Sequence, residues 1–257
     1  TLPPLPEDPE AIPEQYKISY SGTLAFEDLW PKLGDYDMND VMIRYTSKVY
    51  KSILTNRIYK VVDEFTPLHR GGYLVNGFGY QLHNITNSDI SKVTIESPSY
   101  APKSQYMPGE TEAGQSHPTI LLFDNMAIFD NKEEEARKYT VTIQVNDVTS
   151  KSILPPYNPF IFVGSGQARG REVHLVKYPP TDKADLSLLG TGKDVSRPEE
   201  DLYYVSIDLM PFALNMPVSE FPIPEEGIRI DESYPKFATW VKSNGAQAKD
   251  WYKYPKK

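Results

Sequence analysis

Side chains that can supply oxygen ligands gather in one short segment of this chain. They are Glu27, Asp28, Asp35, Asp37, Asn39 and Asp40. Residues 35, 37 and 39 alternate along the sequence, so in an extended or looped backbone their oxygens can converge on one side. Without a counter-charge these carboxylates would repel one another, because each negative charge disfavours the ionisation of its neighbours. The segment therefore predicts a bound cation.

Calcium is the cation that this donor set favours. It takes about six to eight oxygen ligands at flexible geometry, whereas magnesium demands a near-ideal octahedron and zinc prefers histidine or cysteine. The spacing resembles the start of an EF-hand loop, but the glycine at the sixth place is missing and Thr46 stands where the closing acid belongs. A helical EF-hand is therefore excluded, and further ligands would come from Glu27, Asp28, backbone carbonyls or a distant loop. The alternative is a solvated turn whose Asp and Asn side chains bond backbone amides.

Signatures of catalysis are weak elsewhere in the sequence. The histidines are His69, His83, His117 and His174, and the chain has no cysteine. No two histidines are spaced as a zinc site requires. His174 shares a strand face with Glu172, which favours a strand histidine bonded to its neighbour over a catalytic one. Gly164-Ser165-Gly166 is too short for the nucleophile elbow of a serine hydrolase and is typical of a turn. We therefore assign no catalytic residue.

Composition limits the partners of the chain. With 35 acidic and 27 basic residues its net charge is −8, which disfavours nucleic acid because no basic surplus exists to neutralise phosphates. No stretch approaches the roughly 20 apolar residues of a transmembrane helix. No signal peptide is recognisable before Thr1, so a processed or trimmed sequence is expected. Tyr100, Tyr106 and Tyr157, in proline-rich loops, are candidates to contact a glycan or a surface protein.

Runs of β-branched and aromatic residues predict an all-β fold. The predicted strands cover residues 41–50, 56–65, 77–82, 92–96, 119–124, 139–145, 160–163, 171–176 and 202–209. Short strands separated by turns favour a β-sandwich or jelly roll. One short C-terminal helix is predicted over residues 234–242, and a shorter helix over residues 133–138. Residues 1–15, rich in proline and acid, predict an extended linker, and residues 16–257 a single domain.

The chain resembles the LruC-domain family in the acidic segment and its aromatic flank. The similar stretches are residues 22–31, 34–41, 169–175, 190–194, 210–214 and 230–251. Met38 stands where the family has an aromatic residue, and Met210-Pro211-Phe212 replaces a more usual Pro-Trp pair, while the acidic positions are unchanged. The resemblance implies an exported or lipid-anchored surface protein of Bacteroides-type bacteria, whose biochemical role is undetermined. It therefore implies an extracellular or outer-membrane location and a lipid anchor upstream of residue 1.

Together these patterns predict a single calcium-stabilised β-sandwich with a non-catalytic binding or structural role at the cell surface. One alternative is a glycan-binding module or carbohydrate-active enzyme that uses the acidic segment as a cleft. Another is a protein of surface adhesion or assembly, which predicts an exposed apolar or edge-strand patch.

Overall fold

The computed structural model describes residues 15–149, 153–163 and 168–256. The predicted N-terminal linker lies outside the described residues apart from Gln15, and so does the turn predicted at Gly164-Ser165-Gly166. Within the described residues no helix is both long and apolar enough to span a membrane.

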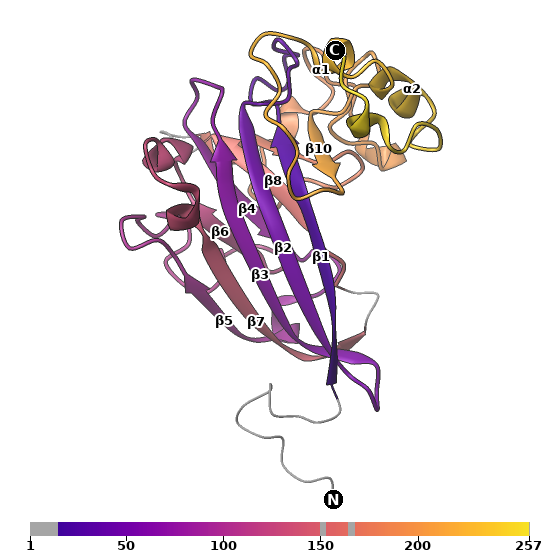
Figure 1. Ribbon diagram of the computed structural model, residues 1–257. Coiled ribbons are helices and arrows are strands. Elements are labelled where there is room, and N and C mark those ends of the chain that lie inside the picture. Colours follow the sequence, from indigo (N-terminus) through magenta and orange to yellow (C-terminus); the bar gives the residue numbers. More distant parts are fainter. Residues whose placement is uncertain (1–14, 150–152, 164–167, 257) are drawn as a thin grey trace, which may run out of the picture.

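Two antiparallel sheets pack face to face and confirm the predicted all-β sandwich (Figure 1). Within the described residues the larger sheet has six strands, in the order β10 (Ala213–Met216), β1 (Gln15–Phe26), β2 (Val41–Ser52), β3 (Arg57–His69), β7 (Tyr139–Thr149) and β5 (Ile90–Glu96). Over the same residues the smaller sheet has four, in the order β6 (Thr119–Phe123), β4 (Asn76–Gln81), β8 (Asn158–Val163) and β9 (Glu172–His174).

The main core lies between the two sheets. Strand β3 alternates buried and half-buried residues, as expected for a strand with one face on the core. The strands β4 and β8 are buried along their whole length. Aromatic rings fill the space between the sheets: Phe65 lies 5.4 Å from Phe78 and 5.0 Å from Tyr80, between ring centroids.

A second, smaller core forms where the C-terminal part of the chain covers the outer face of β1 and β2. We call residues 217–256 the C-terminal cap; it contains α1 (Ile230–Ser233), α2 (Phe237–Lys242) and the 3₁₀ turn η8 (Trp251–Lys253). Ala25 and Met42 alternate with inward-facing neighbours and contact this cap rather than the main core. Its rings pack closely, with Trp251 4.8 Å from Phe237 between ring centroids.

The predicted helices are present in shortened form. The C-terminal prediction corresponds to α2, which follows α1 after a break at Tyr234 and Pro235; a residue before proline is driven out of the helical region. The short prediction at residues 133–138 is a 3₁₀ turn, η4 (Glu134–Arg137). The remaining 3₁₀ turns are η2 (Asn87–Asp89), η3 (Met126–Phe129), η5 (Ala168–Gly170), η6 (Leu186–Leu188) and η7 (Pro198–Glu200).

One predicted strand is wrong, and two strands are absent from the prediction. Residues 202–209 form only isolated bridges, because Tyr204 and Leu209 have positive φ angles of 54° and 63°, which no strand accommodates. The unpredicted strands are β1 and the short β10, which pair with each other.

Candidate metal centre

The acidic residues lie in the loop that joins β1 to β2, at the opposite end of the sandwich from Gln15 (Figure 1). Gly34, Tyr36 and Met38 all adopt left-handed backbone, with φ of 70°, 62° and 63°. A non-glycine residue in this conformation costs about 1–2 kcal/mol, which the full burial of the Tyr36 and Met38 side chains in the second core offsets.

Three of the six predicted ligands converge. One side-chain oxygen each from Glu27, Asp35 and Asp37 lies within 4.8 Å of the others. Glu27 and Asp37 are buried, whereas Asp35 is exposed, so the group opens to solvent on one side only. A cation held there would be enclosed by protein on the Glu27 side and would face water on the Asp35 side.

Glu27 has one side-chain oxygen that no donor in the described part of the chain satisfies. Its Oε1 accepts a hydrogen bond from the backbone N–H of Met38 at 2.7 Å, while its Oε2 is buried and has no hydrogen-bond partner among the described residues. A Cβ on Gly34 would lie 2.9 Å from this Oε2, so the glycine leaves the oxygen uncovered. A buried acceptor without a partner costs about 1–3 kcal/mol, and more when it is charged.

The raised pKa values of these carboxyls also favour a bound cation. Burial raises the pKa of Glu27 well above its usual range, and the charges of Asp40, Asp37 and Asp35 raise it further. Burial also raises the pKa of Asp37, although the N–H of Gly227, 2.8 Å from Asp37 Oδ2, lowers it in part. Because neighbouring negative charge opposes the ionisation of these carboxyls, a bound cation would stabilise their charged form.

Asp28 and Asp40 form a separate pair beside this group. Asp40 Oδ2 accepts from the Asp28 N–H at 2.8 Å, and Asp28 Oδ2 accepts from Asn76 Nδ2 at 2.6 Å. Burial, followed by the repulsion of Asp28, raises the pKa of Asp40 to about 7. Gly72 packs directly against the pair. A Cβ at this position would lie 2.4 Å from Asp28 Oδ2 and 2.9 Å from Asp40 Oδ1, so only glycine fits without a shift.

The sixth predicted ligand, Asn39, is bonded to the C-terminal cap. Its Nδ2 donates to the carbonyl oxygen of Pro224 at 3.3 Å. Its Oδ1 faces Gly71, where a Cβ would approach it to 1.9 Å. Four neighbours of this loop were not predicted from the sequence: Gly71, Gly72, Asn76 and Gly227. The adjacent glycines at 71 and 72 were the one local signal of a close approach.

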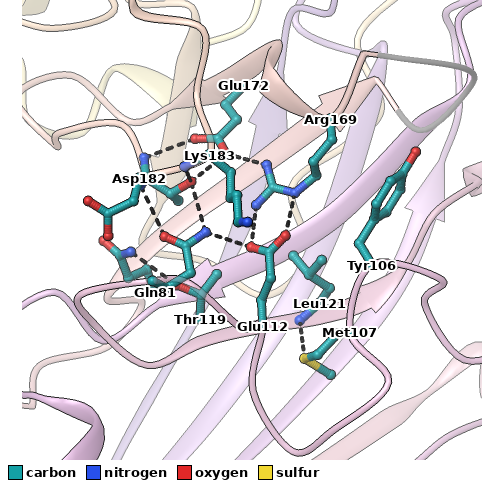
Figure 2. Close-up of polar contacts among 12 residues, drawn as sticks. Gln81, Tyr106, Met107, Glu112, Thr119, Leu121, Arg169, Glu172, Asp182 and Lys183 are labelled. Atoms are coloured by element: carbon teal, nitrogen blue, oxygen red, sulfur yellow. Dashed lines mark hydrogen bonds and ion pairs between the residues drawn. The ribbon is translucent and has the colours of Figure 1, made fainter.

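A second buried polar cluster surrounds His174. His174 Nε2 lies 2.9 Å from Glu172 Oε2, which confirms the predicted hydrogen bond between these neighbours on one strand face. Figure 2 shows Arg169 reaching between Glu172 and Glu112. Arg169 and Glu112 are 57 residues apart in the sequence, and no sequence signal joined them. His174 is fully buried, so it has no access to a substrate.

The three loop tyrosines do not form one surface. Tyr157 lies in the main core and donates to Asp63 Oδ1 at 2.8 Å. Tyr106 packs edge-on against Phe162 at 5.8 Å between ring centroids. Only Tyr100 is exposed, and its hydroxyl donates to the carbonyl oxygen of Ala136.

The fold and the acidic loop define an all-β sandwich protein. Its loop between β1 and β2 carries a carboxylate cluster that opens to solvent on one side. The model of a family described as a domain of unknown function (DUF4842) matches residues 56–252. The chain belongs to this family. No curated protein matches it.

A solved structure shares this fold. The crystal structure of a putative lipoprotein from Bacteroides ovatus superposes with a TM-score of 0.69, over 98% of this chain and 79% of the other, at 19% sequence identity. At this identity the likeness establishes the fold alone.

Proposed function

We propose that this chain is an exported cell-surface protein with a non-catalytic binding or structural role, and that its acidic loop binds a structural calcium ion. The cell-surface location draws support from the fold shared with the Bacteroides ovatus protein, whose name describes a putative lipoprotein, and from the resemblance to LruC-domain proteins. The same resemblance supports a lipid anchor upstream of residue 1.

The buried, unpartnered Oε2 of Glu27 is the observation that carries the calcium proposal. Protein interiors leave few polar groups without a partner, and a bound ion is one explanation of such a group. Asp35 and Asp37 supply two further oxygens within 4.8 Å. Because all three are hard carboxylate oxygens and one side of the group is exposed, water can complete a calcium shell of about six to eight oxygens.

The ion would join the C-terminal cap to the sandwich. Asp37 already holds the cap through the Gly227 N–H at 2.8 Å. The carbonyl oxygen of Tyr36 accepts from the Ile230 N–H at 2.9 Å. A cation on Asp35 and Asp37 would fix the loop that makes these contacts, so ion binding would stabilise the sandwich and the cap together.

Calorimetric titration of the metal-free protein with calcium tests this proposal. We expect binding of one calcium ion, much weaker binding of magnesium, and loss of binding in Glu27→Gln and Asp35→Asn. Glu133→Gln, an exposed acid outside the loop, is the matched control and should bind as the wild type does. The calcium proposal is wrong if the wild type gives no heat of binding, or if the loop variants bind as tightly as it does.

No specific observation favours glycoside cleavage at the acidic loop. Neither of two hollows on the described surface, one beside the end of β3 and one beside residues 220–223, is lined by a residue of the loop. Glycosidases need two carboxyl groups about 5–10 Å apart across an accessible cleft, and two of the three converging carboxylates here are buried.

A further inference from the structure

A hollow of about 400 Å³ lies between the end of β3 and the segment from η3 to η4. Residues 68–70 form one wall; Met126, Phe129, Asp130 and Arg137 form most of the other. Its volume falls in the usual range of small-ligand sites, about 300–1,000 Å³.

Arg137 is held rigidly without being neutralised. Its Nε donates to the carbonyl oxygen of Lys132 at 2.8 Å and one terminal nitrogen to that of Leu68 at 2.9 Å. The other two bonds are a long one from Nη1 to the carbonyl oxygen of Pro67 and a short one from Nη2 to that of Lys132. In the described part of the chain all hydrogen bonds of the Arg137 side chain therefore end on backbone carbonyls. A guanidinium has five N–H groups; these bonds use four and none of them ends on a carboxylate, so the charge of Arg137 is opposed only by the nearby Asp130, which Arg70 also pairs.

The second arginine of the hollow has a carboxylate partner. Arg70 Nη2 pairs with Asp130 Oδ2 at 2.7 Å. The charges of Arg70, Arg137 and Asp130 sum to +1, in a chain whose net charge is −8. The hollow is therefore a local cationic site on an acidic protein, and it favours a negatively charged ligand.

The remaining lining groups suit hydroxyls and a carbon ring. Burial lowers the pKa of His69, so at neutral pH its ring is uncharged and offers one donor and one acceptor. Asn131 is exposed at the rim and offers both kinds of group. Leu68 and Phe129 provide an apolar wall on which the C–H face of a sugar ring can lie.

We propose that this hollow binds a small carboxylated polyol, with a uronic acid as the ligand class, whose carboxylate pairs with Arg137. The ligand's hydroxyls contact Asp130, Asn131 and His69, and its ring lies against Leu68. This site is distinct from the acidic loop and does not depend on calcium bound there.

Titration of the full chain with matched sugars, followed by ¹⁵N–¹H NMR, tests the proposal. The probes are D-glucuronate and D-galacturonate, with D-glucose and D-galactose as uncharged counterparts of the same size. We expect the uronates to shift the amide signals of residues 68–70 and 129–131, and the neutral sugars to bind about tenfold more weakly or worse, because they lack the charged hydrogen bond to Arg137. An oligogalacturonide arm separates a free sugar from a polysaccharide: tighter binding assigns the site to a polymer, equal binding to the monosaccharide.

Two variants examine the role of Arg137. Arg137→Gln should lose about tenfold or more in uronate affinity, whereas Arg197→Gln, an exposed arginine outside the hollow, should lose none. If Arg137→Gln does not fold, uronate affinity is measured with Arg137→Lys instead, which keeps the positive charge. The proposal is overturned if the wild type fails to bind uronates, if it binds neutral sugars equally well, if the shifts map away from the hollow, or if a folded Arg137→Gln retains full affinity.

Discussion

Replacing Glu27 by glutamine should have opposite effects with and without calcium. Without the ion, the wild type carries a buried carboxylate oxygen that has no donor. The substituted amide would keep the carbonyl oxygen that accepts from Met38 and place an N–H₂ group beside the Asp35 and Asp37 oxygens, which lie within 4.8 Å. The substitution therefore removes one unsatisfied buried acceptor and adds a donor to two carboxylates.

The expected magnitudes follow from these contacts. Relief of one unsatisfied buried acceptor is worth about 1–3 kcal/mol, so in chelator the melting temperature of Glu27→Gln should exceed that of the wild type, by about 2–4 °C for each kcal/mol gained. With calcium at a hundred times its dissociation constant, the wild type should gain about 2.7 kcal/mol. For a chain of this size that is a rise in melting temperature of about 5–10 °C. Glu27→Gln should gain little of it.

Thermal unfolding of both proteins in chelator and in calcium measures the four melting temperatures. The expected result is a crossover: the variant is the more stable protein in chelator and the less stable one in calcium. Asp35→Asn, on the exposed side of the group, is the control that should reduce the calcium effect with little change in chelator. The reasoning fails if Glu27→Gln is clearly less stable in chelator, or if calcium raises both melting temperatures equally.

The C-terminal cap should become protease-sensitive when calcium is removed. Glu-C cleavage after Glu226, next to the Gly227 N–H that Asp37 holds, should be faster in chelator; equal cleavage in both states would contradict the link between ion and cap. Gly72→Ala should lower the free energy of unfolding by about 1–3 kcal/mol in urea titration, because its Cβ would meet Asp28 Oδ2 at 2.4 Å, whereas Gly109→Ala, with its nearest atom at 3.7 Å, should change little. Burial raises the pKa of Asp63 from 3.8 to about 6; the folded state then binds the extra proton between these values, so stability falls by about 3 kcal/mol as pH rises from about 4 to 6. Asp63→Asn should abolish that part of the pH profile in urea titrations, and an unchanged profile would show that Asp63 is not its source.

The sheet architecture was predictable because it depends on local pattern. Strand β3 is rich in β-branched and aromatic residues, and its buried and half-buried positions largely alternate, as one buried face requires. Residues 202–209 show the same composition, yet they turn repeatedly through left-handed positions at Tyr204 and Leu209. Strand propensity describes the fit of side chains to a pleated surface, and tertiary contacts can override it.

The clustering of the acidic loop residues was predictable from the sequence. Which of them converge, and which form the separate Asp28–Asp40 pair, was not. Alternation suggested that the oxygens of residues 35, 37 and 39 converge; those of Asp35 and Asp37 do, with Glu27 as the third member, whereas Asn39 donates to the carbonyl oxygen of Pro224. The separation of Asp28 and Asp40 into their own pair depends on Asn76 and Gly72, which reach the loop from the start of β4 and the turn before it. Such partners are set by the packing of distant segments, and the spacing within the loop carries no information about them.

Hydrogen-bond satisfaction, rather than burial or acidity, distinguishes the two charged clusters of this protein. Both oxygens of Glu112 accept from Arg169, at 2.9 and 2.6 Å. Both oxygens of Glu172 also have donors: the Thr181 hydroxyl at 2.6 Å for one, and the Thr181 backbone N–H at 3.0 Å for the other. Figure 2 shows Arg169 next to both Glu172 and Glu112.

A complete network of this kind fixes the fold and leaves nothing for a ligand to satisfy. The acidic loop is equally buried on one side, but Glu27 Oε2 has no donor among the described residues, and these residues supply no positive charge to the three carboxylates that converge there. A cation would meet both needs at once. On our calcium proposal the loop is the cluster in which a ligand would complete the structure, whereas the acids of the Arg169 cluster already have their partners.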